Sequence, residues 1–278
     1  MNPNAEKYSK NNNLPRIWTT NTLSLIKFQR NSYRNVLDIG CGSGEATDML
    51  LSQIKVENLI ASDKYESMVE FARAKYPNPK IEYLVADVTK PDSFRLEWRQ
   101  KFDLITSFLV LQWTPNQYSS LENIKSLLSP NGEVVISIPF GKEAFLRLGD
   151  VADLPKWSPY FQGFTAEWTY NPEWEEFSEW RFPDKETGYR RMAESLGFAV
   201  KQCTLQADGD HVFPDLQSAK GFIGAVLPHA NSKRIPEGRF SEFMDDTIEI
   251  YLQHCPLDEN GKVHFFHDLL VVHLENKA

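Results

Sequence analysis

A short run near the start of the chain constrains the fold more than any other feature. Residues 36–44 read Val-Leu-Asp-Ile-Gly-Cys-Gly-Ser-Gly, which is an apolar stretch with one acidic residue, followed at once by alternating glycines. The apolar stretch predicts a buried strand. Glycine permits left-handed backbone and close approach to a ligand. The run therefore predicts a strand that ends in a glycine loop beside a small anionic or zwitterionic ligand.

The segment from residue 33 to about residue 140 alternates short apolar runs with helical patterns. This alternation predicts βαβ units and a parallel sheet. The Asn131-Gly132 pair predicts a turn before the last of these strands. The expected strands are 35–39, 58–62, 81–85, 102–108 and 133–139, and the expected helices are 44–54, 66–75 and 117–128.

The sequence changes in character after Phe140. Residues 141–182 are rich in tryptophan, phenylalanine and acidic residues and have no clean period. Beyond them we expect a helix from Lys185 to Leu196 that ends at Gly197. The remaining expectations are a strand over 198–205, a helical insertion over 215–254 and a final strand over 262–274. Two late strands joined by an insertion predict an antiparallel edge on the parallel sheet.

Composition narrows the classes of function. The chain has 278 residues, which is enough for one elaborated domain or two small ones. Its net charge of −8 argues against a nucleic-acid partner, because such affinity comes largely from lysine and arginine on phosphates. We find no signal peptide and no long apolar span, so we expect no membrane span and a cytoplasmic protein, as a monomer or a homodimer.

The cysteines and histidines do not form a metal-binding pattern. Cys41, Cys203 and Cys255 are scattered and odd in number, so we expect no disulfide framework and a reducing compartment. His264, His267 and His273 are near one another in sequence, but structural or solvated roles are favoured over a metal site. We therefore expect no bound metal.

Two cofactors compete for the glycine loop. A dinucleotide-binding loop has the pattern G-x-G-x-x-G, and its third glycine would stand at position 45. That position holds Glu45, whose carboxylate would repel a pyrophosphate at the start of a helix. A zwitterionic amino-acid cofactor would meet no such repulsion, and it is the better fit to this loop.

With these features the sequence resembles the class I S-adenosylmethionine-dependent methyltransferases. The resemblance implies an α/β fold with a Rossmann-like, seven-stranded, mostly parallel sheet, an antiparallel final strand, helices on both faces and a helical lid. It also implies a single methyltransferase domain over residues 1–278. Within it, residues 14–140 would form the cofactor-binding core, and residues 141–182 and 215–255 would be lid or substrate insertions.

The resemblance assigns cofactor roles to residues at the ends of the expected strands. Asp63 would bind the ribose hydroxyls, Met68 would pack on adenine and Asp87 would contact the adenine amino group. Taken alone, Asp63 could instead cap the helix over 66–75, Met68 could be a core residue and Asp87 a turn residue. The expected cofactor-binding residues are Tyr8, Asp38, Gly40, Cys41, Gly42, Gly44, Asp63, Lys64, Met68, Ala86, Asp87, Val88 and Ser107.

A narrower resemblance is to a group that contains the trans-aconitate, juvenile hormone acid and malonyl-carrier-protein methyltransferases, all of which esterify carboxylates. Residues 5–12 look like the opening helix of that group, in which Tyr8 would cover the methionine end of the cofactor. Residues 98–103 resemble the juvenile hormone enzymes in particular. Residues 111–113, Leu-Gln-Trp, match the group's active-site segment, although Gln112 stands where the juvenile hormone enzymes usually have histidine.

The chemistry of ester formation agrees with this group. A carboxylate is already ionised at neutral pH and can attack a sulfonium methyl group without a general base. The enzyme then has to align the reactants and exclude water. Gln112 and the Trp113 indole are neutral donors that could orient the acid, so we expect them to be the catalytic residues. Trp113 could otherwise be a core tryptophan. The product would be S-adenosylhomocysteine.

The aromatic segment is the expected substrate wall. Its basic residues Lys142, Arg147, Lys156 and Arg181 are outnumbered by acids, which favours an apolar or amphipathic monocarboxylic acid over a tricarboxylate. These aromatic residues could instead pack on the sheet edge. The expected substrate-contacting residues are Trp157, Tyr160, Trp168 and His229.

Two other functions stay open from the sequence. One is an N- or C-methyltransferase of a small metabolite, which would need a base for its protonated nucleophile. The candidate bases are Glu167, His229 and Tyr160. The other is a cofactor-binding protein that has lost catalysis, since an intact glycine loop says nothing about turnover.

Overall fold

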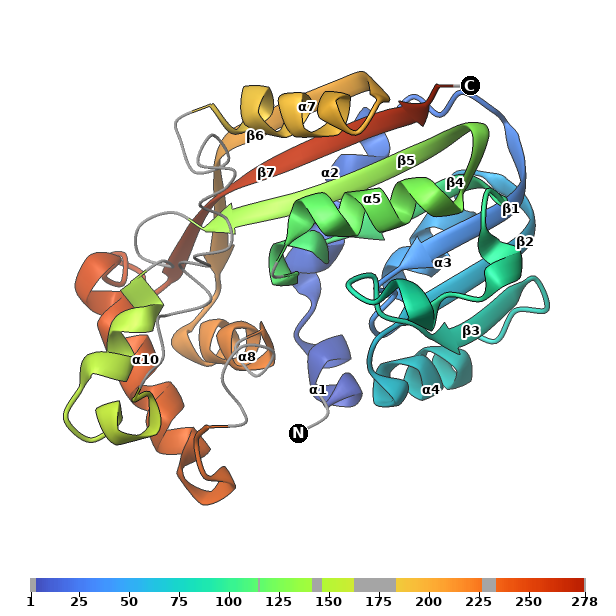
Figure 1. Ribbon diagram of the computed structural model, residues 1–278. Helices are drawn as coiled ribbons and strands as arrows, with labels where there is room; N and C mark the ends of the chain where they lie inside the picture. Colours follow the sequence, from blue (N-terminus) through green and yellow to red (C-terminus); the bar gives the residue numbers. More distant parts are fainter. Residues whose placement is uncertain (1–3, 115, 142–146, 163–183, 227–233, 278) are drawn as a thin grey trace.

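One seven-stranded sheet organises the chain, in the order β3-β2-β1-β4-β5-β7-β6 (Figure 1). The structure is a computed structural model that describes residues 4–114, 116–141, 147–162, 184–226 and 234–277. The strands are β1 (Ser32–Ile39), β2 (Lys55–Asp63), β3 (Ile81–Val85), β4 (Phe102–Phe108), β5 (Leu128–Gly141), β6 (Phe198–Phe213) and β7 (Val263–Asn276).

Helices accompany these strands. The helices are α1 (Ala5–Lys10), α2 (Asn13–Leu25), α3 (Glu45–Leu51), α4 (Glu66–Lys75), α5 (Gln117–Leu127), α7 (Lys185–Ser195), α8 (Leu216–Val226) and α10 (Phe240–His254). Short 3-10 turns are η1 (Pro91–Ser93), η2 (Leu96–Trp98), η3 (Leu111–Trp113), η4 (Arg147–Asp153), η5 (Ser158–Tyr160) and η7 (Glu237–Arg239).

The predicted fold class is confirmed. The strands from β1 to β5 pair in parallel, whereas β7 is antiparallel both to β5 and to β6. The last strand of the chain is therefore the reversed one, and it lies between β5 and β6. Helices cover both faces, as expected.

The predicted end of β6 at Leu205 is wrong, because the strand continues to Phe213. The polar Asp208-Gly209-Asp210 sequence has the composition of a turn, but the structure places a bulge there, with a register shift between Gln206 and Gly209. Asp208 takes a positive φ of 59°, and its backbone N–H donates to the buried Asp268 carboxylate at 3.1 Å. Pairing with β7 thus overrides the local turn signal.

Two apolar layers hold the helices to the sheet. On one face, α2, α3 and α4 pack on the sheet through buried residues such as Trp18, Leu50 and Val69. On the other face, α5 and α7 pack through residues such as Leu121 and Tyr189. The sheet side of each layer comes from alternate residues of the same strands, because successive side chains point to opposite faces. Consequently β1 and β2 are buried on both faces along their second halves, and β4 is buried along most of its length.

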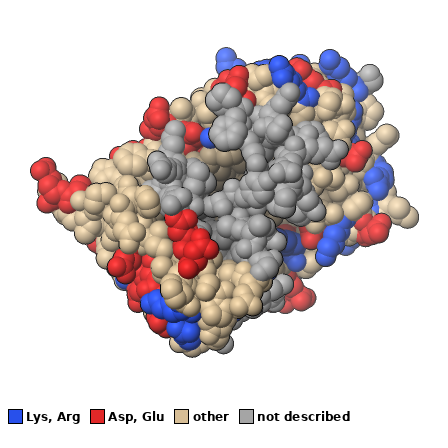
Figure 2. Space-filling model, turned by 60° about the vertical axis from the view of Figure 1, so that its left-hand side comes forward, with Lys and Arg blue, Asp and Glu red and all other residues tan. Residues whose placement is uncertain are grey.

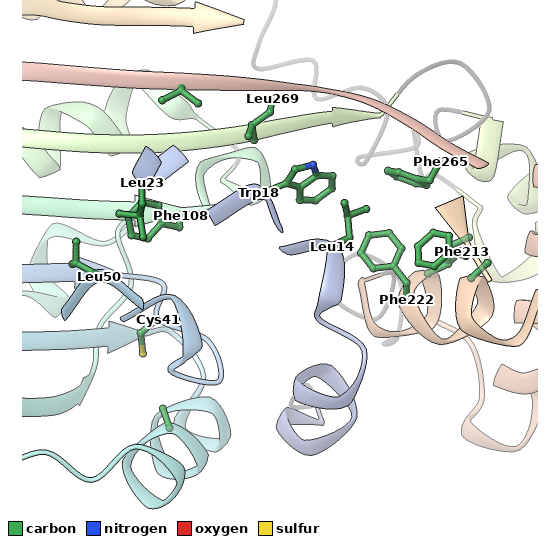
Figure 3. Packing of buried hydrophobic residues seen from close by; sticks show 14 of the residues in the cluster. Leu14, Trp18, Leu23, Cys41, Leu50, Phe108, Phe213, Phe222, Phe265 and Leu269 are labelled. Carbon is green, nitrogen blue, oxygen red and sulfur yellow. The ribbon is translucent and has the colours of Figure 1, made fainter. Parts of the chain in front are cut away.

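The β6–β7 ribbon extends beyond the end of β5 and carries a helical lobe. We call η4, η5, α8, η7 and α10 together the lobe, because they contact one another there. β7 pairs with β5 only from His267 onward, whereas its pairing with β6 begins at Val263. α8 and α10 lie at this free end of the ribbon (Figure 1). The first apolar layer continues into the lobe, because Leu14 and Trp18 of α2 lie beside Phe213, Phe222 and Phe265 (Figure 3). The lobe is therefore packed onto the same core as the sheet.

The strand order reverses at β1. Its neighbours are β2 on one side and β4 on the other. The chain adds β2 and β3 on one side of β1 and then crosses to the other side, where it adds β4 and β5. In open α/β sheets, ligands bind in the crevice beyond the carboxyl ends of the strands at such a reversal. The glycine loop follows β1 and residues 109–113 follow β4, so both segments border this position.

From the sequence we expect no membrane span, no bound metal and no disulfide framework. Within the described ranges, no helix is long and apolar enough to cross a membrane. In the same ranges, no group of three or more histidine, cysteine or acidic side chains is arranged to hold a metal ion. Cys41, Cys203 and Cys255 are buried free thiols.

Candidate functional site

The glycine loop between β1 and α3 makes a tight, left-handed path. Gly40, Gly42 and Gly44 have φ values of 74°, 52° and 87°, which side chains with a Cβ rarely adopt. The backbone N–H groups of Gly40 and Cys41 both donate to the Ser62 carbonyl, at 2.7 and 2.8 Å. The loop is thereby fixed to the end of β2.

The three glycines meet different neighbours. A Cβ on Gly40 would lie 2.3 Å from a methyl carbon of Val110, and a Cβ on Gly44 would lie 2.9 Å from the Tyr76 ring. Gly42 alone among them would take a Cβ without overlap, since the nearest atom, a ring carbon of Tyr8, would be at 3.8 Å. Gly40 and Gly44 therefore allow packing of the loop on its own framework, and Gly42 is the one that faces the candidate ligand position.

The Asp38 carboxylate is directed away from that position. The residue is 1% exposed, and its two oxygens accept hydrogen bonds from Thr47 and Thr106, at 2.5 and 2.7 Å. Burial raises the pKa of Asp38 to about 6, against the opposing effect of the two hydroxyl donors. The carboxylate thus joins β1 to α3 and β4, and the expected place of Asp38 in the cofactor site stays a prediction. The only signal in the sequence for this structural role of Asp38 is the presence of the hydroxyl donors Thr47 and Thr106.

Asp63 lies at the end of β2 and joins two loops. One carboxylate oxygen accepts from the Gly42 N–H at 3.0 Å, and the other accepts from the Tyr65 N–H at 2.9 Å. The helix-capping alternative is not observed, because α4 begins after Tyr65 and has no side-chain cap. Burial is the main cause that raises the pKa of Asp63. Each oxygen keeps a lone pair for a further donor.

The end of β3 lies beside Asp63. The Ala86 N–H donates to the Asp63 carbonyl at 3.1 Å, and Ala86 and Val88 are buried in the second apolar layer. Asp87 makes the turn that was its alternative role, because one carboxylate oxygen accepts from the Thr89 N–H and hydroxyl, at 3.0 and 2.7 Å. Its other oxygen is 3.8 Å from Lys90 Nζ.

Three further expected cofactor-binding residues are Met68 in the first turn of α4, Lys64 just before that helix and Cys41 in the glycine loop. Met68 is buried at 2% exposure, which is compatible with both of its expected roles. Lys64 is exposed, and its ammonium lies 5.1 Å from the centre of the Tyr65 ring. The buried Cys41 thiol has a pKa well above its ordinary value because of burial. Cys41 is thus a small loop residue without a reactive thiolate.

Tyr8 of α1 lies over the glycine loop, as expected for a covering helix. Its ring carbon is the nearest atom to the position that a Gly42 Cβ would take. Burial, followed by the charges of Asp63 and Glu45, raises the pKa of Tyr8 to about 12. The phenol therefore stays neutral at physiological pH beside two carboxylates.

Sequence reasoning missed the role of Glu45. Its carboxylate is not directed at the loop, because it accepts a hydrogen bond from Asn12 Nδ2 and forms an ion pair with Arg16 Nε at 3.3 Å. Because Asn12 and Arg16 hold this carboxylate, it would repel a pyrophosphate at the loop less than a free carboxylate would. Position 45 still lacks the third glycine of a dinucleotide loop.

The segment after β4 packs directly on the glycine loop through Val110. Leu109 has a positive φ of 62°, and Gln112 Nε2 donates to its carbonyl at 2.7 Å. Within the part of the chain that is described, the buried Gln112 Oε1 has no hydrogen-bond partner. Trp113 is partly exposed next to it. This segment brings an oriented amide to the edge of the glycine loop.

Ser107 ends β4 and is fully buried. Its hydroxyl lacks a hydrogen-bond partner among the residues that the structure describes. The expected contact of Ser107 with the cofactor stays a prediction.

The expected substrate residues lie in the helical lobe. Trp157 is 0% exposed, its indole N–H donates to Asp246 at 2.5 Å, and its ring packs against Phe243. Its ring therefore packs within the lobe, and its expected contact with the substrate stays a prediction. The Tyr160 hydroxyl accepts from Arg239 at 3.3 Å. Trp168, His229 and Glu167 lie outside the described residues.

A depression of about 400 Å³ lies at the opposite edge of the sheet. Its lining includes Asn35, Asn58, Lys80 and Lys101, near the amino ends of β1, β2 and β4. Ligands of this fold bind at the carboxyl ends of the strands, so this depression is not the candidate site.

Comparisons with known proteins agree with this geometry. Residues 37–136 match the family described as "Methyltransferase domain". Juvenile hormone acid O-methyltransferase of Bombyx mori is 24% identical over 92% of this chain and 88% of its own length. Trans-aconitate 2-methyltransferase of an Enterobacter species (strain 638) is 31% identical over 41% of this chain and 43% of its own length.

A solved structure gives the same result for the fold. The crystal structure of the YcgJ protein of Bacillus subtilis is similar with a TM-score of 0.59 and 13% identity. The similarity covers 95% of this chain and 99% of the YcgJ chain. It extends beyond the family match, through the late strands.

Proposed function

We propose, from the premise that this chain belongs to the class I S-adenosylmethionine-dependent methyltransferases, that it methylates the carboxylate of a small apolar or amphipathic acid. The methyl donor would be S-adenosylmethionine, and the products would be a methyl ester and S-adenosylhomocysteine. The proposal is built on the residues around the glycine loop and on those that follow β4.

The residues around Gly42 fit such a donor. Gly42 has no Cβ, so its backbone could approach an amino-acid moiety closely, and the Tyr8 ring lies 3.8 Å from the position that a Cβ would take. The Asp63 carboxylate, tied to the Gly42 N–H, keeps lone pairs that could accept from ribose hydroxyls. Asp87 and the buried Met68 would serve the adenine side, and Tyr8 would exclude water from the sulfonium side.

S-adenosylmethionine supplies an electrophilic methyl group when it is bound. The protein's own residues would then have to orient the acid and keep water out, because an ionised carboxylate needs no base. One amide N–H of Gln112 is committed to the Leu109 carbonyl, which fixes the orientation of the amide. Its second N–H can donate to a carboxylate oxygen. Such a neutral donor orients the nucleophile without the strong stabilisation that an arginine would give.

The observation that carries the proposal is the packing of Val110 on Gly40. Because a Cβ at Gly40 would meet Val110 at 2.3 Å, the glycine loop and the Gln112 segment are in direct contact. A donor held by the loop and an acid oriented by Gln112 would therefore be neighbours. The relative from Bombyx mori, whose name specifies an acid O-methyltransferase, supports the same class of acceptor.

The charges of the lobe support an acid with one carboxylate. We propose that the lobe is the lid over the acceptor. Three of its described cations are already paired: Lys156 with Asp246 at 2.7 Å, Lys220 with Asp245 at 2.7 Å, and Arg239 with Glu242 at 3.0 Å. At the lower edge of the lobe, basic side chains lie beside acidic ones (Figure 2). Cations held in such pairs are poorly placed to bind a tricarboxylate.

The test is a screen of carboxylic acids with methyl-labelled S-adenosylmethionine. Fatty and terpenoid acids should give base-labile methyl esters, and tricarboxylates should give little product. A pH–rate profile should show no essential base near pH 7. A profile that requires such a base, or label in amines instead of esters, would contradict the proposal.

A second candidate is a methyltransferase for an acceptor that carries an N–H or O–H group. The buried Gln112 Oε1 favours it, because this oxygen could accept from such a group but not from a carboxylate. Amines and alcohols therefore belong in the same screen, in parallel with the acids.

A further inference from the structure

α1 lies between the two halves of the molecule and contacts both (Figure 1). On the sheet side, the Ser9 hydroxyl accepts from Lys75 Nζ of α4 at 2.6 Å. On the lobe side, the Asn11 amide oxygen is only 2.2 Å from where a Cβ on Gly221 of α8 would be. Tyr8 of the same helix lies next to Gly42. The position of Tyr8 thus depends on what holds the segment from α1 to the start of α2.

Glu45 is the link between that segment and the glycine loop. It is the first residue of α3, directly after Gly44. One carboxylate oxygen accepts from Asn12 and the other pairs with Arg16. Asn12 is buried at 6% exposure, and the Glu45 side chain is 16% exposed, so this pair is largely shielded from water. Hydrogen bonds to a shielded carboxylate are stronger than those between exposed neutral groups.

We propose that Glu45 is a positioning residue for the methyl donor, and that it acts by holding the α1–α2 corner so that Tyr8 covers Gly42. The inference rests on the proposed donor site at the glycine loop. Glu45 itself need not touch the donor, since its two oxygens are used by α2. Its loss should release α1 and expose the site to water.

The test uses the full chain with S-adenosylhomocysteine as the probe, measured by calorimetry. Glu45→Ala removes both contacts, and Asn12→Ala removes one from the α2 side. The pair Asn12→Asp with Glu45→Gln exchanges donor and acceptor and keeps the hydrogen bond. Glu82→Ala is the matched control, because Glu82 forms an exposed ion pair with Arg95 on the outer strand β3. Trypsin cleavage after Lys7 and Lys10 reports release of α1.

We expect Glu45→Ala to weaken binding about tenfold, as for the loss of a hydrogen bond to a charged group. Cleavage in α1 should become faster, and Asn12→Ala should change both readouts in the same direction. The exchanged pair should recover binding to within about threefold, and Glu82→Ala should match the original protein.

Three outcomes would contradict either this inference or the proposed function on which it rests. If the unaltered protein binds no S-adenosylhomocysteine, the proposed function fails and not merely this inference. If it binds but Glu45→Ala and Asn12→Ala bind equally well, the inference is overturned. If both weaken binding and the exchanged pair gives no rescue, Glu45 acts on the loop directly and the holding role is overturned. If Glu45→Ala does not fold, binding and cleavage of Asn12→Ala and of the exchanged pair still test the inference.

Discussion

The Asp63 carboxylate accepts a hydrogen bond from the Gly42 N–H at 3.0 Å, so the end of β2 is joined to the middle of the glycine loop. The same carboxylate holds the Tyr65 N–H at the start of α4. It borders the loop that follows β1, the strand at which the strand order reverses, and ligands of such sheets bind near that reversal. One side chain therefore shapes the loop and faces the proposed donor.

The first prediction concerns this carboxylate. Asp63→Asn keeps an oxygen for the Gly42 N–H but loses the charge that ribose hydroxyls would meet. We expect it to weaken S-adenosylhomocysteine binding by about 2 kcal/mol, roughly thirtyfold. Asp63→Ala should weaken binding further and also lower the melting temperature, because the two backbone N–H groups lose their acceptor. Calorimetry and thermal melting measure both effects, and unchanged binding in Asp63→Ala would remove Asp63 from the site.

The second prediction separates the glycines. Both Gly40→Ala and Gly42→Ala force a Cβ into left-handed backbone, at a cost of about 1–2 kcal/mol. Gly40→Ala should cost more, because its Cβ would overlap Val110, and Val110→Ala in the same chain should restore part of the stability. Gly42→Ala should mainly reduce donor binding. Urea unfolding and calorimetry test this, and equal losses of stability in the two variants would contradict it.

The third prediction follows from Asp38, whose folded-state pKa is raised to about 6 by burial. Between about pH 4 and pH 6 the folded protein binds more protons at this group than the unfolded chain. The contribution of Asp38 to the free energy of unfolding therefore falls as pH rises through this range, by roughly 2–3 kcal/mol, and is constant above it. The difference in unfolding free energy between the original protein and Asp38→Asn should show this fall. A difference that rises with pH would have the wrong sign.

The fourth prediction tests the acceptor side. Gln112→Ala removes the amide that is bound to the Leu109 carbonyl and leaves the donor site intact. We expect kcat to fall at least about tenfold, while S-adenosylhomocysteine binding stays within about twofold. Steady-state kinetics on an acid found by the screen gives the first quantity. Lost binding with unchanged kcat would reverse the assigned roles.

The fifth prediction lies at the opposite end of the sheet, where Glu133 is fully buried. Burial alone would raise its pKa, but hydrogen bonds from His273 at 2.8 Å, Tyr33 at 2.7 Å and the Gln29 N–H lower it below its ordinary value. Glu133 thus stabilises the fold above its unfolded-state pKa, and this contribution is lost as pH falls through the lower folded-state value.

Glu133→Ala should accordingly lose about 3 kcal/mol of unfolding free energy at pH 7, since it leaves buried partners unpaired. The loss should shrink under acidic conditions. Binding of S-adenosylhomocysteine should not change at a temperature where the variant is folded, because the network is remote from the glycine loop. A loss of binding without a loss of stability would contradict this prediction, because it would mean that Glu133 acts on the donor site and not on the stability of the fold.

Much of the framework was predictable because its signals are local. The apolar run over 36–39 and the glycines after it predicted β1 and its loop, and the alternation of patterns predicted the parallel strands. Local signals failed where pairing with a distant strand decided the outcome. The Asp208-Gly209-Asp210 sequence has the composition of a turn, yet β7 holds it in β6 through Asp268.

The sequence by itself determined the sheet, the glycine loop and the class of site, because periodicity and backbone freedom act between near neighbours. Only the tertiary structure decided the side-chain partners: Asp38 faces Thr47 and Thr106, Glu45 faces α2, and Trp157 is buried in the lobe. These partners are brought together by packing between elements far apart in the chain. No pattern within either segment encodes such a contact, because its geometry exists only after the layers have assembled.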